Sequence, residues 1–174
     1  MAGPQFSASG SVRHHRPRRR FTLEQANRSL PLVRRIVTDV VRAHTQVLKL
    51  QRELERIAQA AKPPRKAAAG RDRAQAAQVA HVAEAPAQPV ADAPAVQAQL
   101  EAAVHRLEDY VDELSEIGCD LKDYSAGLID FIGRHQGRDV CLCWKLGEDR
   151  VGYWHELDAG FGGRQPVSTL RETE

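Results

Sequence analysis

Long hydrophobic runs are absent from this 174-residue sequence. No stretch approaches the roughly 18 consecutive apolar residues that indicate a membrane-spanning helix. The arginine-rich N-terminus is also not followed by the apolar segment of a secretory signal. We therefore expect no membrane partner.

Cysteine is scarce, with only Cys119, Cys141 and Cys143. An odd number at no scaffold spacing argues against a disulfide framework and for a reducing compartment, so the sequence predicts a cytoplasmic location. A Cys₃His zinc site with His155 is conceivable, but one residue separates Cys141 from Cys143 where structural zinc usually uses two-residue knuckles. A nucleophilic Cys143–His155 pair would need an exposed sulfur, whereas cysteine in an apolar strand is more often buried. We expect no metal and no cofactor.

A charge excess of either sign is missing too, because 25 basic residues nearly balance 23 acidic ones. No field of the whole protein therefore favours nucleic acid or a membrane surface. Residues 1–20 are the local exception and predict a disordered basic tail. Its arginines could make weak contacts with nucleic-acid phosphates or an anionic surface, although no aromatic side chain lies between them to stack on bases. They are Arg13, Arg16, Arg18, Arg19 and Arg20.

The chain length suits one domain, which we place at residues 21–166. Within it, residues 62–95 hold five prolines amid alanine and few large apolar side chains. This composition predicts a flexible linker that interrupts the domain. Residues 167–174 are expected to form a C-terminal tail.

Two helices are predicted on either side of the linker. Thr22 and Gln25 have the spacing of a capping box, and Pro31 is expected to interrupt the helix, giving a short helix, a kink and then a long helix. Apolar residues then recur at alternating intervals of four and three over residues 36–61 and again over 96–117, as in a coiled coil. The first helix is mainly basic and the second mainly acidic, which favours an antiparallel pair.

The apolar stripe of the first helix is wider than one partner helix can cover. Val33, Val37 and Leu48 lie beside the seam, and an uncovered apolar stripe usually marks an interface. The sequence therefore predicts self-association, most simply as a homodimer.

After Gly118 the pattern changes from helical spacing to alternation. Residues 128–132, 140–145 and 151–156 are rich in β-branched and aromatic side chains, and glycine-containing turns separate them. In the middle strand, Cys141 and Cys143 should share the face opposite Val140, Leu142 and Trp144. The predicted fold is α+β, an antiparallel long-helix hairpin packed with a small three-stranded antiparallel sheet.

Several short motifs are spread over both the helical and the strand regions. They are Phe21–Asn27 with Leu30-Pro31, Gly118-Cys119, Lys122-Asp123, Gly127–Phe131, Gly137-Arg138, Leu142–Trp144 with Gly147-Glu148, and Trp154–Glu156 with Gly160-Phe161. Together these motifs resemble one known family, the bacterial domain of unknown function 2203, over about residues 21–165 apart from the linker. The resemblance implies a compact bacterial cytosolic protein and brings no substrate or catalytic residue.

A candidate ligand site lies where the last predicted strand ends. His155, Glu156 and Asp158 precede a glycine-rich loop and Arg164, an arrangement that could hold a phosphate or carboxylate. Asp130 could join them, because a buried carboxylate needs a donor such as His155, Arg138 or Arg164. Lys122 and Asp123 lie in the loop that approaches Asp130. The alternative is a set of structural ion pairs.

Motifs for common reactions are missing. The sequence contains no phosphate-binding loop, no nucleophile triad signature and no zinc-protease motif. Whether the protein is an enzyme therefore stays open. We expect a non-enzymatic interaction or scaffold module that self-associates through its helices. The alternative is a small-molecule or anion-binding protein, with its site around His155, Glu156, Asp158 and Arg164.

The linker assignment predicts where a protease cuts first. Under mild trypsin treatment, cleavage should begin near Arg65, Lys66, Arg71 or Arg73, because a flexible exposed segment fits a protease cleft. Mass spectrometry of the first fragments identifies the cut sites. Protection of all four sites while the N-terminal tail is nicked would contradict the assignment.

Overall fold

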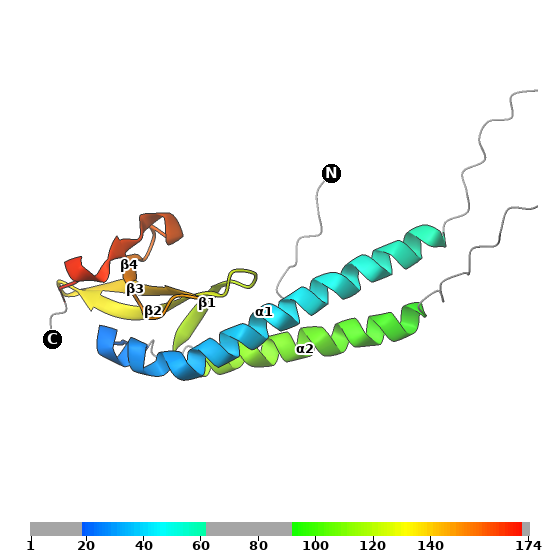
Figure 1. Cartoon of the computed structure of the whole chain (residues 1–174), viewed down its shortest axis with the longest axis horizontal. Helices are drawn as coiled ribbons and strands as arrows, with labels where there is room; N and C mark the ends of the chain where they lie inside the picture. Colours follow the sequence, from blue (N-terminus) through cyan, green and yellow to red (C-terminus); the bar gives the residue numbers. More distant parts are fainter. Residues whose placement is uncertain (1–18, 62–91, 172–174) are drawn as a thin grey trace, which may run out of the picture.

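The computed structural model describes residues 19–61 and 92–171. Two long helices run side by side, and a small sheet lies against one end of the pair (Figure 1). Helix α1 spans Leu23–Ala60 and helix α2 spans Ala93–Ile117. The strands follow α2 in the chain, so the described part has the predicted α+β class.

Helix α1 begins at the predicted capping box. The Gln25 backbone N–H donates to Thr22 Oγ1, and the Thr22 backbone N–H donates to Gln25 Oε1, both at 3.1 Å. The predicted break at Pro31 is wrong, because α1 continues through that residue. Pro31 is exposed, while Leu30 and Val33 on either side of it are buried in the core. Burial of this apolar stripe offsets the free-energy cost of the backbone hydrogen bond that proline cannot make.

Helix α2 ends as the sequence predicts, since Gly118 has φ 104° and its N–H donates to the carbonyl of Leu114. Away from the sheet, the two helices pack through their predicted seams, and Val47, Leu50, Val96 and Ala103 are buried there. Helix α2 starts at Ala93, so residues 93–95 belong to the helix instead of the predicted linker. Residues 62–91 of that linker lie outside the described residues.

The sheet is an antiparallel meander of five strands in the order of the chain, where the sequence predicted three. The first strand was missed because it is short and three of its five residues are charged, and the last because it has two residues, one of them a proline at the sheet edge. The strands are β1 Cys119–Asp123, β2 Leu128–His135, β3 Arg138–Lys145, β4 Tyr153–Glu156 and β5 Gln165–Pro166.

One face of the sheet packs on the helices and forms the main core. Phe131, Leu142 and Trp144 of this inner face are fully buried in one cluster with α1 residues. Val33 and Val37, the part of the stripe that seemed to need a second copy, are fully buried in this same cluster. That part of the argument for self-association is therefore wrong, because the sheet of the same chain covers both valines.

Polar contacts also tie α1 to the loop between β3 and β4. Asn27 accepts the Val151 backbone N–H at 2.9 Å through its side-chain oxygen. Arg34 donates to the backbone carbonyls of Glu148 and Asp149 at 2.9 and 3.0 Å. This loop is thereby held in place, and Glu148 with it.

Both ends of the described chain join the sheet region, although they were assigned to tails. Arg20 forms a bidentate pair with Asp139 at 2.8 and 3.1 Å, and it bridges to Ile132 beside β2. At the other end, Val167 and Leu170 pack against the main core. The folded unit therefore begins before residue 21 and continues past residue 166, while residues 1–18 and 172–174 lie outside the described residues.

Within the described residues, neither helix combines the length and the apolar composition needed to cross a membrane.

The packing of α1 on the sheet can be tested with two leucines that flank Pro31. Leu30 is 4% exposed in the core, whereas Leu32 is 49% exposed. Leu30→Ala should lower the free energy of unfolding by about 2–5 kcal/mol, because it leaves a cavity between helix and sheet. Leu32→Ala, the matched control, should cost less than about 1 kcal/mol. Urea unfolding followed by circular dichroism measures both, and equal losses would contradict this packing.

Candidate polar site on the outer face of the sheet

The face of the sheet turned away from the helices carries buried polar side chains. Because side chains alternate along a strand, the burial of Phe131 and Leu142 against the helices sends Asp130, Cys141 and Cys143 to the other face. Asp130 pairs with Cys143 across β2 and β3, and Cys141 pairs with His155 across β3 and β4. Three adjacent strands therefore bring these side chains together.

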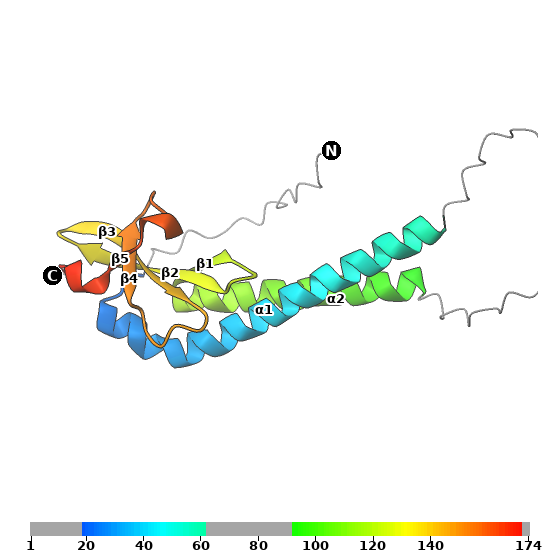
Figure 2. The same cartoon turned by 45° about the horizontal axis from the view of Figure 1, so that its top comes forward.

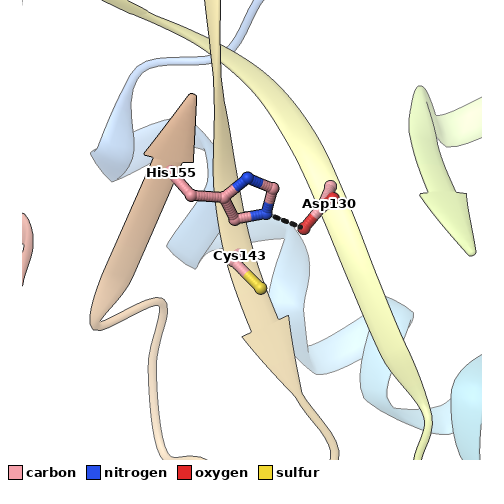
Figure 3. Close-up of side chains that lie close together, drawn as sticks. All are labelled: Asp130, Cys143 and His155. Carbon is pink, nitrogen blue, oxygen red and sulfur yellow. Dashed lines mark hydrogen bonds and ion pairs between the residues drawn. The ribbon is translucent and has the colours of Figure 1, made fainter. Parts of the chain in front are cut away.

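His155 and Asp130 are in direct contact across β3 (Figure 3). His155 Nε2 lies 3.3 Å from Asp130 Oδ1, and both side chains are 3% exposed. The other ring nitrogen, Nδ1, lies 2.8 Å from the backbone carbonyl oxygen of Glu156. Since a carbonyl oxygen only accepts, Nδ1 carries a proton and donates it. The contact between Nε2 and Asp130 therefore requires a second proton, held by the imidazolium or by the carboxyl group.

Cys143 completes this group. Its Sγ, a carboxylate oxygen of Asp130 and a ring nitrogen of His155 all lie within 4.8 Å of one another. Burial, together with the nearby Asp130 charge, raises the pKa values of Cys141 and Cys143 to about 12. Both therefore remain thiols at neutral pH, which argues against a nucleophilic cysteine.

Cys119 does not take part in this group. It is buried in the main core with the helices, and its Sγ lies 3.4 Å from the carbonyl oxygen of Leu114. The Cys₃His arrangement considered from the sequence is therefore not assembled. All three cysteines are free.

Arg164 pairs with Glu148 beside this group, and its Nη2 also lies 3.4 Å from the carbonyl oxygen of Cys143. Its guanidinium donates to both Glu148 oxygens at 2.7 and 2.9 Å and is flanked by the rings of Tyr153 and Phe161, 4.5 and 4.7 Å away. Burial acts to raise the pKa of Glu148, but hydrogen bonds from Arg164 and the Lys145 N–H outweigh it and hold the pKa below its usual range. The charge of Arg164 is thus already compensated.

The other predicted site residues are dispersed. Glu156 pairs with Arg138 at 3.1 Å, and Lys122 lies 3.7 Å from Asp120. Asp158 is exposed after β4.

Asp123 stabilises the turn before β2. Its Oδ1 accepts the backbone N–H groups of Ala126 and Ser125 and the Ser125 hydroxyl, and these bonds lower its pKa. Of the seven candidate residues, only Asp130 and His155 therefore meet.

The sequence suggested Cys143 only as a zinc ligand with the other cysteines or as a nucleophile, and Glu148 was not among the candidate site residues. The alternation in β3 already placed Cys143 on the outer face, and only its register with Asp130 was unknown. Glu148 carried no local signal, since it lies in a turn 16 positions before Arg164.

Two surface hollows of the described structure lie elsewhere. One is beside the start of α1 and includes Leu23, Asn27 and Arg150; the other follows Arg35 and Arg42 along the same helix. Neither is lined by a predicted site residue.

Comparison with known families gives one assignment. The family model DUF2203, described as an uncharacterized conserved protein, matches residues 19–167. No curated protein and no solved structure matches the chain. The matched range contains both helices, the whole sheet and the outer-face group of Asp130, Cys143 and His155. This chain is therefore a member of the DUF2203 family.

Proposed function

We propose that this protein is a non-enzymatic interaction module, and that it self-associates through the part of its helix pair that extends beyond the sheet. We name this part the arm and define it as residues 47–60 of α1 and 93–107 of α2. Helix α1 has 38 residues, about 57 Å at a rise of about 1.5 Å per residue. Five strands spaced by about 4.8 Å span only about 20 Å, so much of the helix pair extends past them.

The observation that carries the proposal is the incomplete burial of the arm. Beyond Val47, Leu50, Val96 and Ala103, the seam residues Leu54, Ile57, Leu100 and Val104 are only partly buried. Leu48 adjoins this seam and is 37% exposed. Two helices cover one stripe of each other, whereas a second copy would enclose the seam in a four-helix bundle.

The arm carries little net charge. Its α1 part holds three basic and two acidic residues, and its α2 part holds one of each. Because these charges nearly cancel, two arms can pack against each other without net repulsion, and a two-fold arrangement repeats the same contact twice.

The dispersal of the sheet-end charges supports a non-enzymatic role. An anion site would need a cation with spare charge, yet Arg164 is paired with Glu148 and Arg138 with Glu156. Convergence of several such groups in one pocket would instead favour the ligand-binding alternative. The three free, buried cysteines fit the cytoplasmic location that we propose for this module.

Self-association predicts a measurable mass. At tens of micromolar, light scattering should give twice the 19.3 kDa of one chain. Leu48→Glu should shift the mass to that of a monomer, because it places two buried charges in the bundle. Gln46→Glu also introduces a glutamate, but at an exposed position two residues away, and should leave the dimer intact.

Circular dichroism serves as the control, and it should show that both variants keep their helices. A monomeric mass for the unmodified protein at these concentrations would contradict the proposal, as would a dimer that tolerates Leu48→Glu.

A further inference from the structure

The group of Asp130, Cys143 and His155 has no role in the proposed interaction module. It joins a carboxylate oxygen, an imidazole nitrogen and a sulfur within 4.8 Å, from Asp130, His155 and Cys143 at 3%, 3% and 0% exposure. Figure 3 shows His155 directed at Asp130, with Cys143 beside them on the strand between. Both ring nitrogens of His155 already have partners, so an additional partner would have to replace the contact between Nε2 and Asp130.

The orientation of His155 indicates what such a partner would be. Because Nδ1 donates to the carbonyl of Glu156, the Nε2 atom is directed at Asp130. Metal-binding histidines almost always use this arrangement, in which one ring nitrogen is fixed by a hydrogen bond and the other coordinates. The surrounding protein thus presets the ring as a ligand.

We propose that Asp130, Cys143 and His155 bind a zinc ion. Zinc accepts carboxylate oxygen, imidazole nitrogen and thiolate sulfur, with bonds of about 2.0–2.3 Å that place neighbouring donors roughly 3.5 Å apart. The His155–Asp130 distance of 3.3 Å already matches one edge of such a tetrahedron. Cys143 lies within 4.8 Å of both, so its sulfur needs to approach by about 1.3 Å at most.

The balance of protons and charge favours the replacement of two protons by one zinc ion. Without metal, the His155–Asp130 pair shares one proton beyond that on Nδ1, and Cys143 holds its thiol proton. Zinc replaces these two protons with its two positive charges and leaves one carboxylate, one thiolate and a neutral imidazole. The buried group is neutral before and after binding, which avoids the large cost of an uncompensated buried charge.

The chain also covers the site. The loop between β4 and β5 lies on the side of the sheet opposite the helices (Figure 2). Within it, a Cβ added at Gly163 would lie 4.0 Å from the Cβ of His155, so the backbone passes close to this ligand. Zinc held here would join three neighbouring strands, and a neutral water in the fourth position would keep the site uncharged.

Cobalt titration of the full, tag-free chain tests the proposal. Co²⁺ should bind once per chain with tetrahedral visible absorption and a thiolate-to-cobalt band in the near ultraviolet, and Zn²⁺ should displace it. Mutation of a residue that only hydrogen-bonds to a metal ligand weakens metal affinity by about 10–100-fold. Cys143→Ser should therefore weaken binding by more than about 100-fold and abolish the sulfur band. Cys119→Ser, which alters a buried cysteine outside the group, should leave both unchanged.

A measurement on the unmodified chain makes the test independent of whether Cys143→Ser folds. In long-range ¹H–¹⁵N spectra, Zn²⁺ should shift Nε2 of His155 and leave the proton on Nδ1. Unchanged His155 resonances, metal binding without a sulfur band, or full binding by folded Cys143→Ser would each overturn the zinc site. None of these results bears on the dimer, whose test uses only the mass of the chain.

Discussion

The hydrophobic contact between α1 and the inner face of the sheet is the constraint on which the rest of the structure depends. It buries Val33 and Val37 of the helix with Phe131 and Leu142 of the sheet. Since neighbouring side chains of a strand point to opposite faces, this contact decides which residues reach the outer face. The outer-face group of Asp130, Cys143 and His155 is a direct consequence of how the inner face packs.

The same contact separates two regions with different chemistry. Near the sheet, the apolar stripe of α1 is covered by strands of its own chain, whereas in the arm it meets only α2. Figure 1 shows this division, with the sheet beside one end of the helix pair. The proposed dimer therefore depends on the arm, and the proposed zinc site depends on the strands. Each can fail without the other.

Local patterns predicted much of this fold. Patterns between residues close in the sequence were enough to predict four features. These are the capping box at Thr22, the two helical seams, the end of α2 at Gly118 and the two faces of β3. The break at Pro31 did not occur, because burial of Leu30 and Val33 outweighs the local cost of proline. Partners far apart in sequence were harder to assign. Asp130 had three candidate donors, and only the register of β2, β3 and β4 selects His155, while Glu148 became the partner of Arg164 through a loop that α1 positions.

The protonation of His155 tests this account most directly, because it reports how the outer face is organised before any metal or second copy is considered. Long-range ¹H–¹⁵N spectra of the metal-free protein distinguish the two ring nitrogens. The structure predicts a proton on Nδ1, since that nitrogen donates to the carbonyl of Glu156. A neutral ring protonated only on Nε2 would contradict the account.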